Sequence, residues 1–367
     1  MMTPTGPAPR PGILEIAPYV AGEAKIAGVE RSIRLASNES ALGPSPKAIA
    51  AYRSLAGEIH RYPDGSADEL REAIGRRHGL DPARIVCGAG SDELITLLLR
   101  GYAGPGDEVL YSRHGFLMYP INAQTVGATP VAAPERALTT DVDALLERVS
   151  QRTKIVFVAN PNNPTGTYLG TAEMARLRAG LPPSVVLAID AAYAEFVNRN
   201  DYEAGAALVD RAGNVVMLRT FSKIYALAGL RLGWAYCPPA IADILNRLRS
   251  PFNVNAPALA AGVAAVEDVA ALVHAQAHNQ RWLAWFSERL AALGIPLTPS
   301  VANFVLARFP DNPRKNADAV FAFLQRHGIL TRKMGAYGLS EYLRITIGTG
   351  EEMERVAATL GEIMAAR

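Results

Sequence analysis

The sequence has few cysteines. Among its 367 residues only Cys87 and Cys237 are cysteine, and they form neither a disulfide framework nor a metal-binding spacing. Unpaired thiols of this kind are typical of proteins that remain in a reducing compartment. We therefore expect a cytoplasmic protein without structural disulfides.

The sequence also lacks an excess of charge of one sign and a long apolar run. Its 37 basic and 35 acidic residues leave a formal net charge of +2, which argues against nucleic acid as a partner. The longest apolar stretch, residues 256–266, is too short to span a bilayer. The proline-rich start, residues 1–12, has no apolar core of the kind that a secretory signal requires. We expect no contact with membranes.

The residues that are present suit a globular α/β protein. Hydrophobic residues make up 49% of the chain, which is enough for a sizeable core in two or three domains. Short apolar runs, separated by helical patterns, indicate buried strands of a mostly parallel sheet flanked by helices. These runs occupy residues 84–87, 155–159, 185–189 and 215–218.

One lysine lies in a chemically unusual stretch, residues 219–234, directly after the last of these runs. Thr220 and Ser222 supply hydroxyl donors, and Arg231 supplies a planar cationic group that suits a phosphate. Lys223 supplies an amine that can form a Schiff base with an aldehyde. The ligand implied is an aldehyde that carries a phosphate, and pyridoxal 5'-phosphate fits this description.

A second phosphate-binding feature follows the run at residues 84–87. After Gly88 and Gly90, an apolar helical pattern begins at Ser91, so the backbone amides of Ser91 and Asp92 can accept a phosphate. We interpret the Asp92 carboxylate as a first-turn charge of the helix. A dinucleotide fingerprint is excluded because Glu93 stands where a third small residue is needed.

A carboxylate ends another strand. Asp190 directly follows the run at residues 185–189, and facing a pyridine nitrogen it would keep that nitrogen protonated. Ser91, Asn163, Asp190 and Lys223 each lie just beyond a predicted strand, at the sheet edge where open α/β sheets bind ligands.

A metal site is the alternative that the histidines raise. His274 and His278 are four residues apart on one predicted helix, but the sequence offers no acidic third ligand beside them. We therefore expect no metal.

These motifs resemble those of fold-type I, class-II pyridoxal-phosphate aminotransferases, and most closely the histidinol-phosphate aminotransferases. The resemblance runs from about residue 13 to the last helix, and one of its most specific strings is the loop at residues 160–166. One departure is Ser40-Ala41, where the family usually has Asn-Pro, and another is Ala191 in place of Glu.

The resemblance implies roles for further residues around the cofactor. Asn163 and Tyr193 would contact the ring oxygen, Phe116 would cover the ring face, and Tyr62 would reach the cofactor phosphate of the neighbouring subunit in a homodimer. With Lys223 and Asp190, Tyr193 completes the expected catalytic set. The expected cofactor-binding set is Gly90, Ser91, Asp92, Phe116, Asn163, Asp190, Tyr193, Thr220, Ser222, Lys223, Arg231 and Tyr62.

The resemblance also implies the substrate site and the reaction. Arg344 and Arg332 would bind the anionic end of the substrate, Tyr19 would close over it, and Asn163 would lie beside it. The implied reaction transfers the amino group of histidinol phosphate to 2-oxoglutarate. The alternatives are an aromatic amino-acid aminotransferase, a pyridoxal-phosphate-dependent decarboxylase of a phospho-amino acid, and a non-catalytic regulator that binds the cofactor.

The domain organisation expected from these patterns has three parts. Residues 1–34 form an N-terminal arm, residues 35–250 a large cofactor-binding domain, and residues 251–367 a smaller α/β domain. A turn-rich stretch at residues 249–255 marks the hinge between the last two.

Overall fold

The computed structural model describes residues 6–20, 22, 25–26 and 32–366, so part of the expected N-terminal arm lies outside the described residues. The strands are β1 (Ile33–Arg34), β2 (Ile85–Gly88), β3 (Glu108–Ser112), β4 (Thr129–Ala133), β5 (Glu135–Arg136), β6 (Thr139–Thr140), β7 (Thr153–Ala159), β8 (Val186–Asp190), β9 (Val215–Thr220), β10 (Gly233–Tyr236), β11 (Phe304–Arg308), β12 (Ile329–Leu330), β13 (Arg332–Lys333) and β14 (Tyr342–Thr346). The α-helices are α1 (Pro46–Ser54), α2 (Asp68–His78), α3 (Ser91–Tyr102), α4 (Met118–Thr125), α5 (Val142–Leu146), α6 (Thr171–Gly180), α7 (Ala206–Arg211), α8 (Pro239–Leu248), α9 (Ala256–Glu267), α10 (Val269–Ala292), α11 (Ala317–Arg326) and α12 (Gly350–Ala365). Short 3-10 helices are η1 (Ile13–Glu15), η2 (Pro82–Arg84), η3 (Ala194–Phe196), η4 (Ala228–Leu230) and η5 (Gly335–Tyr337).

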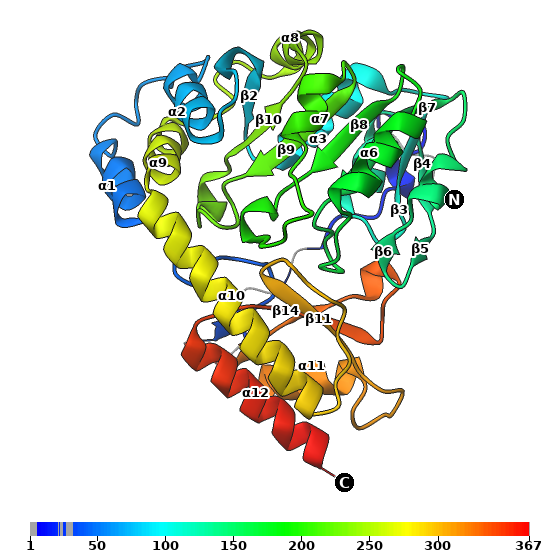
Figure 1. The fold of residues 1–367 in the computed structure, drawn as a ribbon, viewed down its shortest axis with the longest axis vertical. Helices are drawn as coiled ribbons and strands as arrows, with labels where there is room; N and C mark the ends of the chain where they lie inside the picture. Colours follow the sequence, from blue (N-terminus) through cyan, green and yellow to red (C-terminus); the bar gives the residue numbers. More distant parts are fainter. Residues whose placement is uncertain (1–5, 21, 23–24, 27–31, 367) are drawn as a thin grey trace.

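A seven-stranded sheet organises the larger part of the molecule. Its strand order is β2-β10-β9-β8-β7-β3-β4, and every neighbouring pair is parallel except the two that β10 makes with β2 and β9. The expected mostly parallel sheet flanked by helices is confirmed (Figure 1). Because β8 and β9 are adjacent and parallel, their carboxyl ends lie side by side at one edge of the sheet.

Alternating residues of the central strands face two separate cores. In β7, Val156 and Val158 pack into a cluster that includes residues of α2, α6 and α9, whereas Ile155 and Phe157 pack into a cluster with residues of α3, α4 and α8. This alternation follows from the two-residue period of a strand. Both faces are covered, which explains why the strands appear in the sequence as continuous apolar runs.

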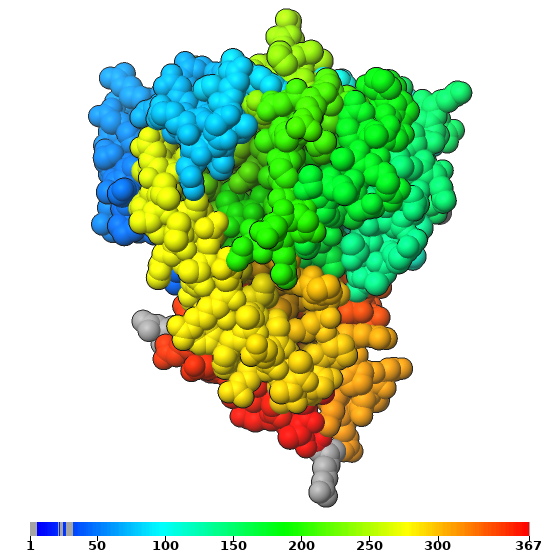
Figure 2. Space-filling view, viewed as in Figure 1, coloured from blue at the N-terminus to red at the C-terminus, as the bar shows by residue number. Residues whose placement is uncertain are grey.

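The C-terminal part is built on a smaller sheet with the order β11-β14-β13. Its core contains Leu343 and Ile345 of β14 with residues of α10, α11 and α12, and Ile33 and Leu35 from the N-terminal side of the chain join the same core. Strand β1 pairs in parallel with β12, so residues 33–35 run along this part. Figure 2 shows the C-terminal part, coloured orange to red, beneath the wider part that holds the seven-stranded sheet.

The apolar stretch at residues 256–266 lies in helix α9, which Asp268 separates from the longer helix α10. The side chain of Asp268 accepts a hydrogen bond from the backbone N–H of Ala271 and so begins a second helix. Helix α9 packs against α1 and α2, and α10 descends from there to the C-terminal part (Figure 1). No single helix among the described residues is long and apolar enough to cross a membrane; α9 and α10 pass that test only as a pair, bent by 76°.

Candidate active site

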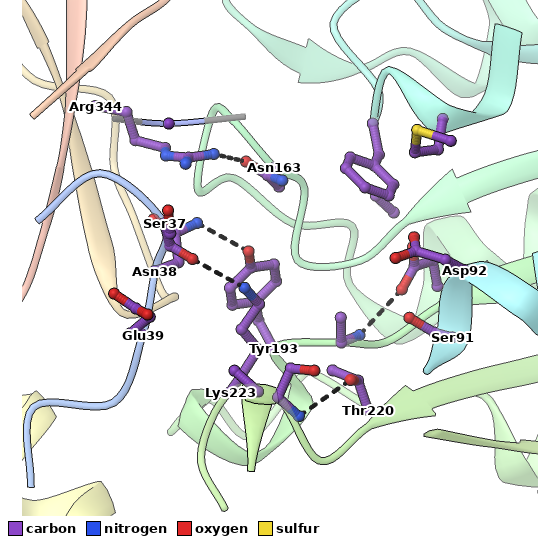
Figure 3. Close-up of a pocket in the computed structure, with 18 of the residues that line it drawn as sticks. Ser37, Asn38, Glu39, Ser91, Asp92, Asn163, Tyr193, Thr220, Lys223 and Arg344 are labelled. Atoms are coloured by element: carbon purple, nitrogen blue, oxygen red, sulfur yellow. Dashed lines mark hydrogen bonds between the residues drawn. The ribbon is translucent and has the colours of Figure 1, made fainter. Parts of the chain in front are cut away.

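A cavity of about 480 Å³ lies where the carboxyl ends of the central strands meet the C-terminal part. Nearly all of the site residues predicted from the sequence line it, and Figure 3 shows several of them, among them Lys223, Tyr193 and Arg344. The predicted residues that line the cavity are Tyr19, Ser91, Asp92, Phe116, Asn163, Asp190, Tyr193, Thr220, Ser222, Lys223, Arg231, Arg332 and Arg344. The tertiary structure therefore brings together groups that are far apart in the chain.

The start of α3 forms one wall of the cavity, and two glycines allow its close approach to neighbouring residues. Gly90 has a φ of +84°, and a Cβ atom there would lie 2.6 Å from Nη2 of Arg231. A Cβ atom on Gly233 would lie 2.5 Å from the backbone nitrogen of Ser91. No side chain caps this helix start, so its first amides and the positive end of the helix dipole are available to an anion.

Arg231 completes a cradle that suits a phosphate. Its Nη1 donates to Oγ of Ser222 over 3.2 Å, and its Nη2 donates to Oδ2 of Asp92 over 3.2 Å. The Asp92 carboxylate is therefore more than the first-turn charge that the sequence indicated, because it pairs with Arg231. Both side chains are about half exposed, at 47% and 44%, so a phosphate can reach the guanidinium from the cavity. The backbone N–H of Ser222 donates to Oγ1 of Thr220, which orders the turn after β9.

Lys223 lies three residues beyond β9 with its amine in the middle of the cavity wall (Figure 3). Its Nζ donates a 3.1 Å hydrogen bond to the carbonyl oxygen of Ser37 and lies 5.7 Å from the centre of the Tyr193 ring. Burial, together with the positive charge of Arg344, lowers the pKa of this amine to about 8. A substantial fraction of the amine is therefore neutral, and so nucleophilic, near neutral pH.

Asp190 ends strand β8 and is only 6% exposed. Its Oδ2 accepts a 2.8 Å hydrogen bond from the hydroxyl of Tyr119, and its Oδ1 accepts one of 3.2 Å from the backbone N–H of Ala192. Burial raises the pKa of the Asp190 carboxyl to about 6, although the Tyr119 hydrogen bond opposes that rise. A cationic group placed beside this carboxylate would satisfy the negative charge that burial otherwise penalises.

Tyr119 is a site residue that the sequence reasoning missed. It is fully buried in α4, with its ring stacked on Phe157 at 4.7 Å between centroids and an interplanar angle of 5°. Phe116 meets the ring of Tyr119 edge-on at 5.8 Å. The available signal was the spacing, since Tyr119 follows Phe116 by three residues, about one turn of a helix.

The expected ring-oxygen contacts, Asn163 and Tyr193, line the same cavity as Arg344, the first of the two arginines expected to bind the substrate. Arg344 donates from Nη1 to Oδ1 of Asn163 and from Nη2 to the carbonyl oxygen of Ala36, the second over 2.8 Å. Tyr193 accepts a 2.8 Å hydrogen bond from Nδ2 of Asn38, and burial raises the pKa of its phenol to about 12. Tyr193 therefore keeps its proton and can donate it.

The second expected arginine lies beside the first. Arg332 of β13 is directly opposite Arg344 of β14 in the strand register, and both line the cavity. Nη2 of Arg332 donates to the carbonyl oxygen of Val20 over 2.5 Å, and its guanidinium carbon lies 6.0 Å from the centre of the Tyr19 ring. Two guanidinium groups at one end of the cavity form a site for an anion.

Residues 36–38 were also missed as site residues. The carbonyl oxygen of Ala36 accepts from Arg344, that of Ser37 accepts from Lys223, and Asn38 donates to Tyr193. Ala36 and Asn38 are 3% and 1% exposed, so the departure at Ser40-Ala41 leaves this segment well packed. The signal in the sequence was the Asn-Glu pair at residues 38–39, to which no contact had been assigned.

Tyr62 does not line this cavity. Its side chain is 82% exposed and stacks on Phe252 at 4.7 Å between ring centroids.

The described residues contain no group of three or more metal-ligating side chains, and Nε2 of His278 lies 2.9 Å from the carbonyl oxygen of Gly348.

The residues around the cavity fit pyridoxal phosphate by their chemistry. Gly90 and Gly233 allow Arg231 and β10 to lie close against the start of α3, where the backbone amides and the guanidinium suit a phosphate. The Lys223 amine, whose pKa is lowered, and the buried Asp190 carboxylate line the same cavity. Arg332 and Arg344 also line it. We find at one cavity each group that an aldehyde, a ring nitrogen and a phosphate require.

Comparison with known proteins agrees with this chemistry. The family "aminotransferase class I and II" matches residues 30–360. A histidinol-phosphate aminotransferase of Paramagnetospirillum magneticum is 62% identical over 362 residues, covering 99% of this chain and 100% of the relative. One of Rhodospirillum centenum is 62% identical over 358 residues, covering 98% of this chain and 99% of the relative.

A solved structure shares the fold over nearly its whole length. The histidinol-phosphate aminotransferase of Sinorhizobium meliloti, solved in complex with pyridoxal 5'-phosphate, superposes with a TM-score of 0.89 at 28% identity, covering 99% of each chain. The chain therefore belongs to the class I and II aminotransferases, and within them to the histidinol-phosphate aminotransferase family.

Proposed function

We propose that this enzyme transfers the amino group of L-histidinol phosphate to 2-oxoglutarate, giving imidazole acetol phosphate and L-glutamate, a reaction of histidine biosynthesis, with pyridoxal 5'-phosphate as cofactor. The observation that carries the proposal is the 62% identity over nearly the full length to relatives named histidinol-phosphate aminotransferase. The cavity supports it, because the chemical groups that such a reaction needs are present around one space.

The residues that would hold the cofactor surround Lys223. The amides of Ser91 and Asp92 at the start of α3, with Arg231 and Ser222, would bind its phosphate. The other cofactor contacts that we propose are Gly90, which allows Arg231 to approach the start of α3, Thr220, which orders the turn, Phe116 on the ring face, Asp190 at the ring nitrogen, and Asn163 and Tyr193 at the ring oxygen.

The chemistry divides between the cofactor and the chain. The bound cofactor supplies an aldehyde that takes up the amino group and a ring that withdraws electrons from the α-carbon of the substrate. Lys223 acts as the base that moves the α-proton, and with a pKa of about 8 roughly a quarter of its amine is neutral at pH 7.5. Asp190 keeps the ring nitrogen protonated, and Tyr193 donates to the ring oxygen.

Arg344 and Arg332 would bind the anionic end of each substrate. The anion is a phosphate in one half-reaction and a carboxylate in the other. Guanidinium groups bind the oxygens of either group through paired hydrogen bonds. Arg344 is 7% exposed, and Ala36 and Asn163 hold its orientation. Tyr19, 47% exposed beside Arg332, would close over the bound anion.

We further propose a homodimer in which Tyr62 reaches the cofactor phosphate of the neighbouring subunit. The exposed Tyr62 ring, its stacking on Phe252, and the exposed apolar side chains of Tyr52 and Ile59 in the same segment support an interface that includes residues 52–62. A cytoplasmic location is also our proposal, because Cys87 and Cys237 are free thiols. The division into an arm, a large domain and a small domain remains a proposal as well.

A panel of amino donors with 2-oxoglutarate tests the substrate. We expect histidinol phosphate to give the highest kcat/KM. If phenylalanine or tyrosine is turned over far more efficiently, the enzyme is an aromatic amino-acid aminotransferase instead. If an amino-acid donor of the panel releases carbon dioxide and forms no oxo product, the enzyme is a decarboxylase. Binding of the cofactor without turnover of any donor would point to a regulator.

A further inference from the structure

Asn38 lies at the centre of a buried chain of hydrogen bonds that joins the C-terminal part to Tyr193 (Figure 3). The backbone N–H of Asn38 donates to Oγ1 of Thr346 over 3.0 Å, and the Thr346 hydroxyl lies 3.1 Å from Oδ1 of Asn38. Nδ2 of Asn38 lies 2.8 Å from the Tyr193 hydroxyl. Asn38 and Thr346 are 1% and 2% exposed, so each polar atom needs a partner inside the protein.

The donors and acceptors in this chain fix its direction. Oγ1 of Thr346 already accepts from the Asn38 backbone, and its own proton finds an acceptor in Oδ1 of Asn38. If the oxygen and nitrogen of the Asn38 amide were exchanged, Thr346 would face an NH₂ group. The proton of the Thr346 hydroxyl would then have no acceptor among the described residues. The satisfied arrangement places Nδ2 against Tyr193, so the Tyr193 oxygen accepts a hydrogen bond.

The consequence falls on the proton of Tyr193. Because the Asn38 side of its oxygen is occupied by a donor, the O–H must point elsewhere, and Tyr193 borders the cavity that also contains Asn163 and Lys223. We infer that Asn38 is a positioning residue that, ordered by Thr346, forces the Tyr193 hydroxyl to donate into the cavity toward an oxygen atom of the bound cofactor. This inference rests on the proposed function, which places the ring oxygen of pyridoxal phosphate beside Tyr193.

The backbone of Asn38 suits this task. Its φ is +55°, a left-handed conformation that asparagine adopts more readily than most residues. Its carbonyl oxygen accepts a 3.1 Å hydrogen bond from Nδ2 of Asn303, just before β11. The side chain can therefore be changed in its hydrogen bonding while the segment stays anchored through Asn303.

Two variants test the inference. One reverses the direction of the hydrogen bond between residue 38 and Tyr193, and the other removes the hydroxyl that orients the Asn38 amide. Asn38→Asp replaces the donor by an acceptor of the same shape, so the Tyr193 proton turns away from the cavity. Thr346→Val removes the hydroxyl that orders the Asn38 amide and adds no charge. The charged groups that influence the Tyr193 hydroxyl include Arg344, Asp190 and Asp92, with Lys223 against its ring, and Thr346→Val changes none of them.

Two readouts separate this role from a merely structural one. A donor to the cofactor's ring oxygen favours its deprotonated form, so we expect both variants to raise the pH midpoint of the absorbance change of the bound cofactor by about one unit. We also expect the apoenzyme to bind pyridoxal phosphate roughly tenfold more weakly. Thr346→Ser, which keeps the hydroxyl, should restore the wild-type midpoint.

Asn303→Ala is the matched control. It removes a hydrogen bond to the carbonyl oxygen of Asn38 and leaves the hydrogen bonds of the Asn38 side chain to Thr346 and Tyr193 in place. It should lower the melting temperature without moving the midpoint. A wild-type midpoint in both Asn38→Asp and Thr346→Val would overturn the inference, as would an equal shift in Asn303→Ala. Wild-type protein that binds no pyridoxal phosphate would overturn the proposed function together with it, which distinguishes the two failures.

Discussion

The hydrogen bond between Tyr119 and Asp190 gives a prediction whose size follows from the structure. Tyr119→Phe removes one hydroxyl from a fully buried ring and keeps the packing of that ring on Phe157 at 4.7 Å and against Phe116 at 5.8 Å. Asp190 then retains only the 3.2 Å hydrogen bond from the Ala192 backbone. The variant therefore changes the charge state of the carboxyl more than the shape of the site.

The expected shift in pKa can be worked out. A hydrogen bond to a charged group contributes about 1.5 to 3 kcal/mol, and about 1.4 kcal/mol corresponds to one pKa unit. Losing the Tyr119 hydroxyl should therefore raise the pKa of Asp190 from about 6 to roughly 7 to 8. At pH 6.5 the ionised fraction falls from about three quarters to between about 3 and 25 per cent, whereas at pH 9 it stays near complete in both proteins.

The assay is the affinity of the apoenzyme for pyridoxal phosphate as a function of pH. Under the proposed function only ionised Asp190 holds the protonated ring nitrogen, so the variant should bind roughly 3- to 25-fold more weakly at pH 6.5 and within about twofold of wild type at pH 9. Tyr168→Phe is the matched control, because it removes a hydrogen bond of the same 2.8 Å length to Asp201 at the surface. A loss of affinity that is the same at every pH would refute the reasoning.

The remaining predictions concern Lys223, Arg344 and the Asp190 carboxyl itself. Lys223→Ala should abolish transamination, because the amine and the base are lost together, while inorganic phosphate still raises the melting temperature of the apoenzyme; substantial turnover would contradict this role. Arg344→Ala should raise KM for histidinol phosphate and lower kcat/KM by roughly 2 to 4 kcal/mol, about 30- to 900-fold, and an unchanged KM would exclude it as the anion site. Asp190→Asn tests the raised pKa of about 6 against its ordinary value of 3.8. A raised carboxyl pKa means that the folded state binds protons more tightly, so the wild-type apoenzyme loses stability as pH rises through this window. Denaturant unfolding should show the variant gaining about 2.4 kcal/mol relative to wild type between pH 4 and pH 7, and a difference independent of pH would argue against the shift.

Much of the fold could be predicted because buried parallel strands leave a clear pattern in a sequence. The runs before Asp190 and Lys223 are continuous and apolar, since both faces of β8 and β9 are covered by helices. Strand β10 was not predicted, and its antiparallel pairing with β2 and β9 depends on which strands flank it. The break between α9 and α10 at Asp268 was not predicted either, although aspartate is a frequent helix N-cap.

The sequence alone determined the chemical identity of the site. Lys223, Asp190 and Arg231 each follow a local signal, either a strand end or a dense cluster of polar groups, and such signals need no knowledge of the third dimension. Asn38 and Tyr119 follow no strand end and lie in no dense polar cluster, so their signals in the sequence are weaker. Their roles depend on partners that are 155 and 71 residues away in the chain.

Only the tertiary structure decided which atom donates to which. A hydrogen bond depends on distance and direction at the scale of tenths of an ångström, and those quantities arise when the strand ends, residues 36–38 and β14 pack together. The sequence could therefore name the amine, the carboxylate and the arginines, whereas the folded chain fixed their orientation, their burial and hence their pKa values.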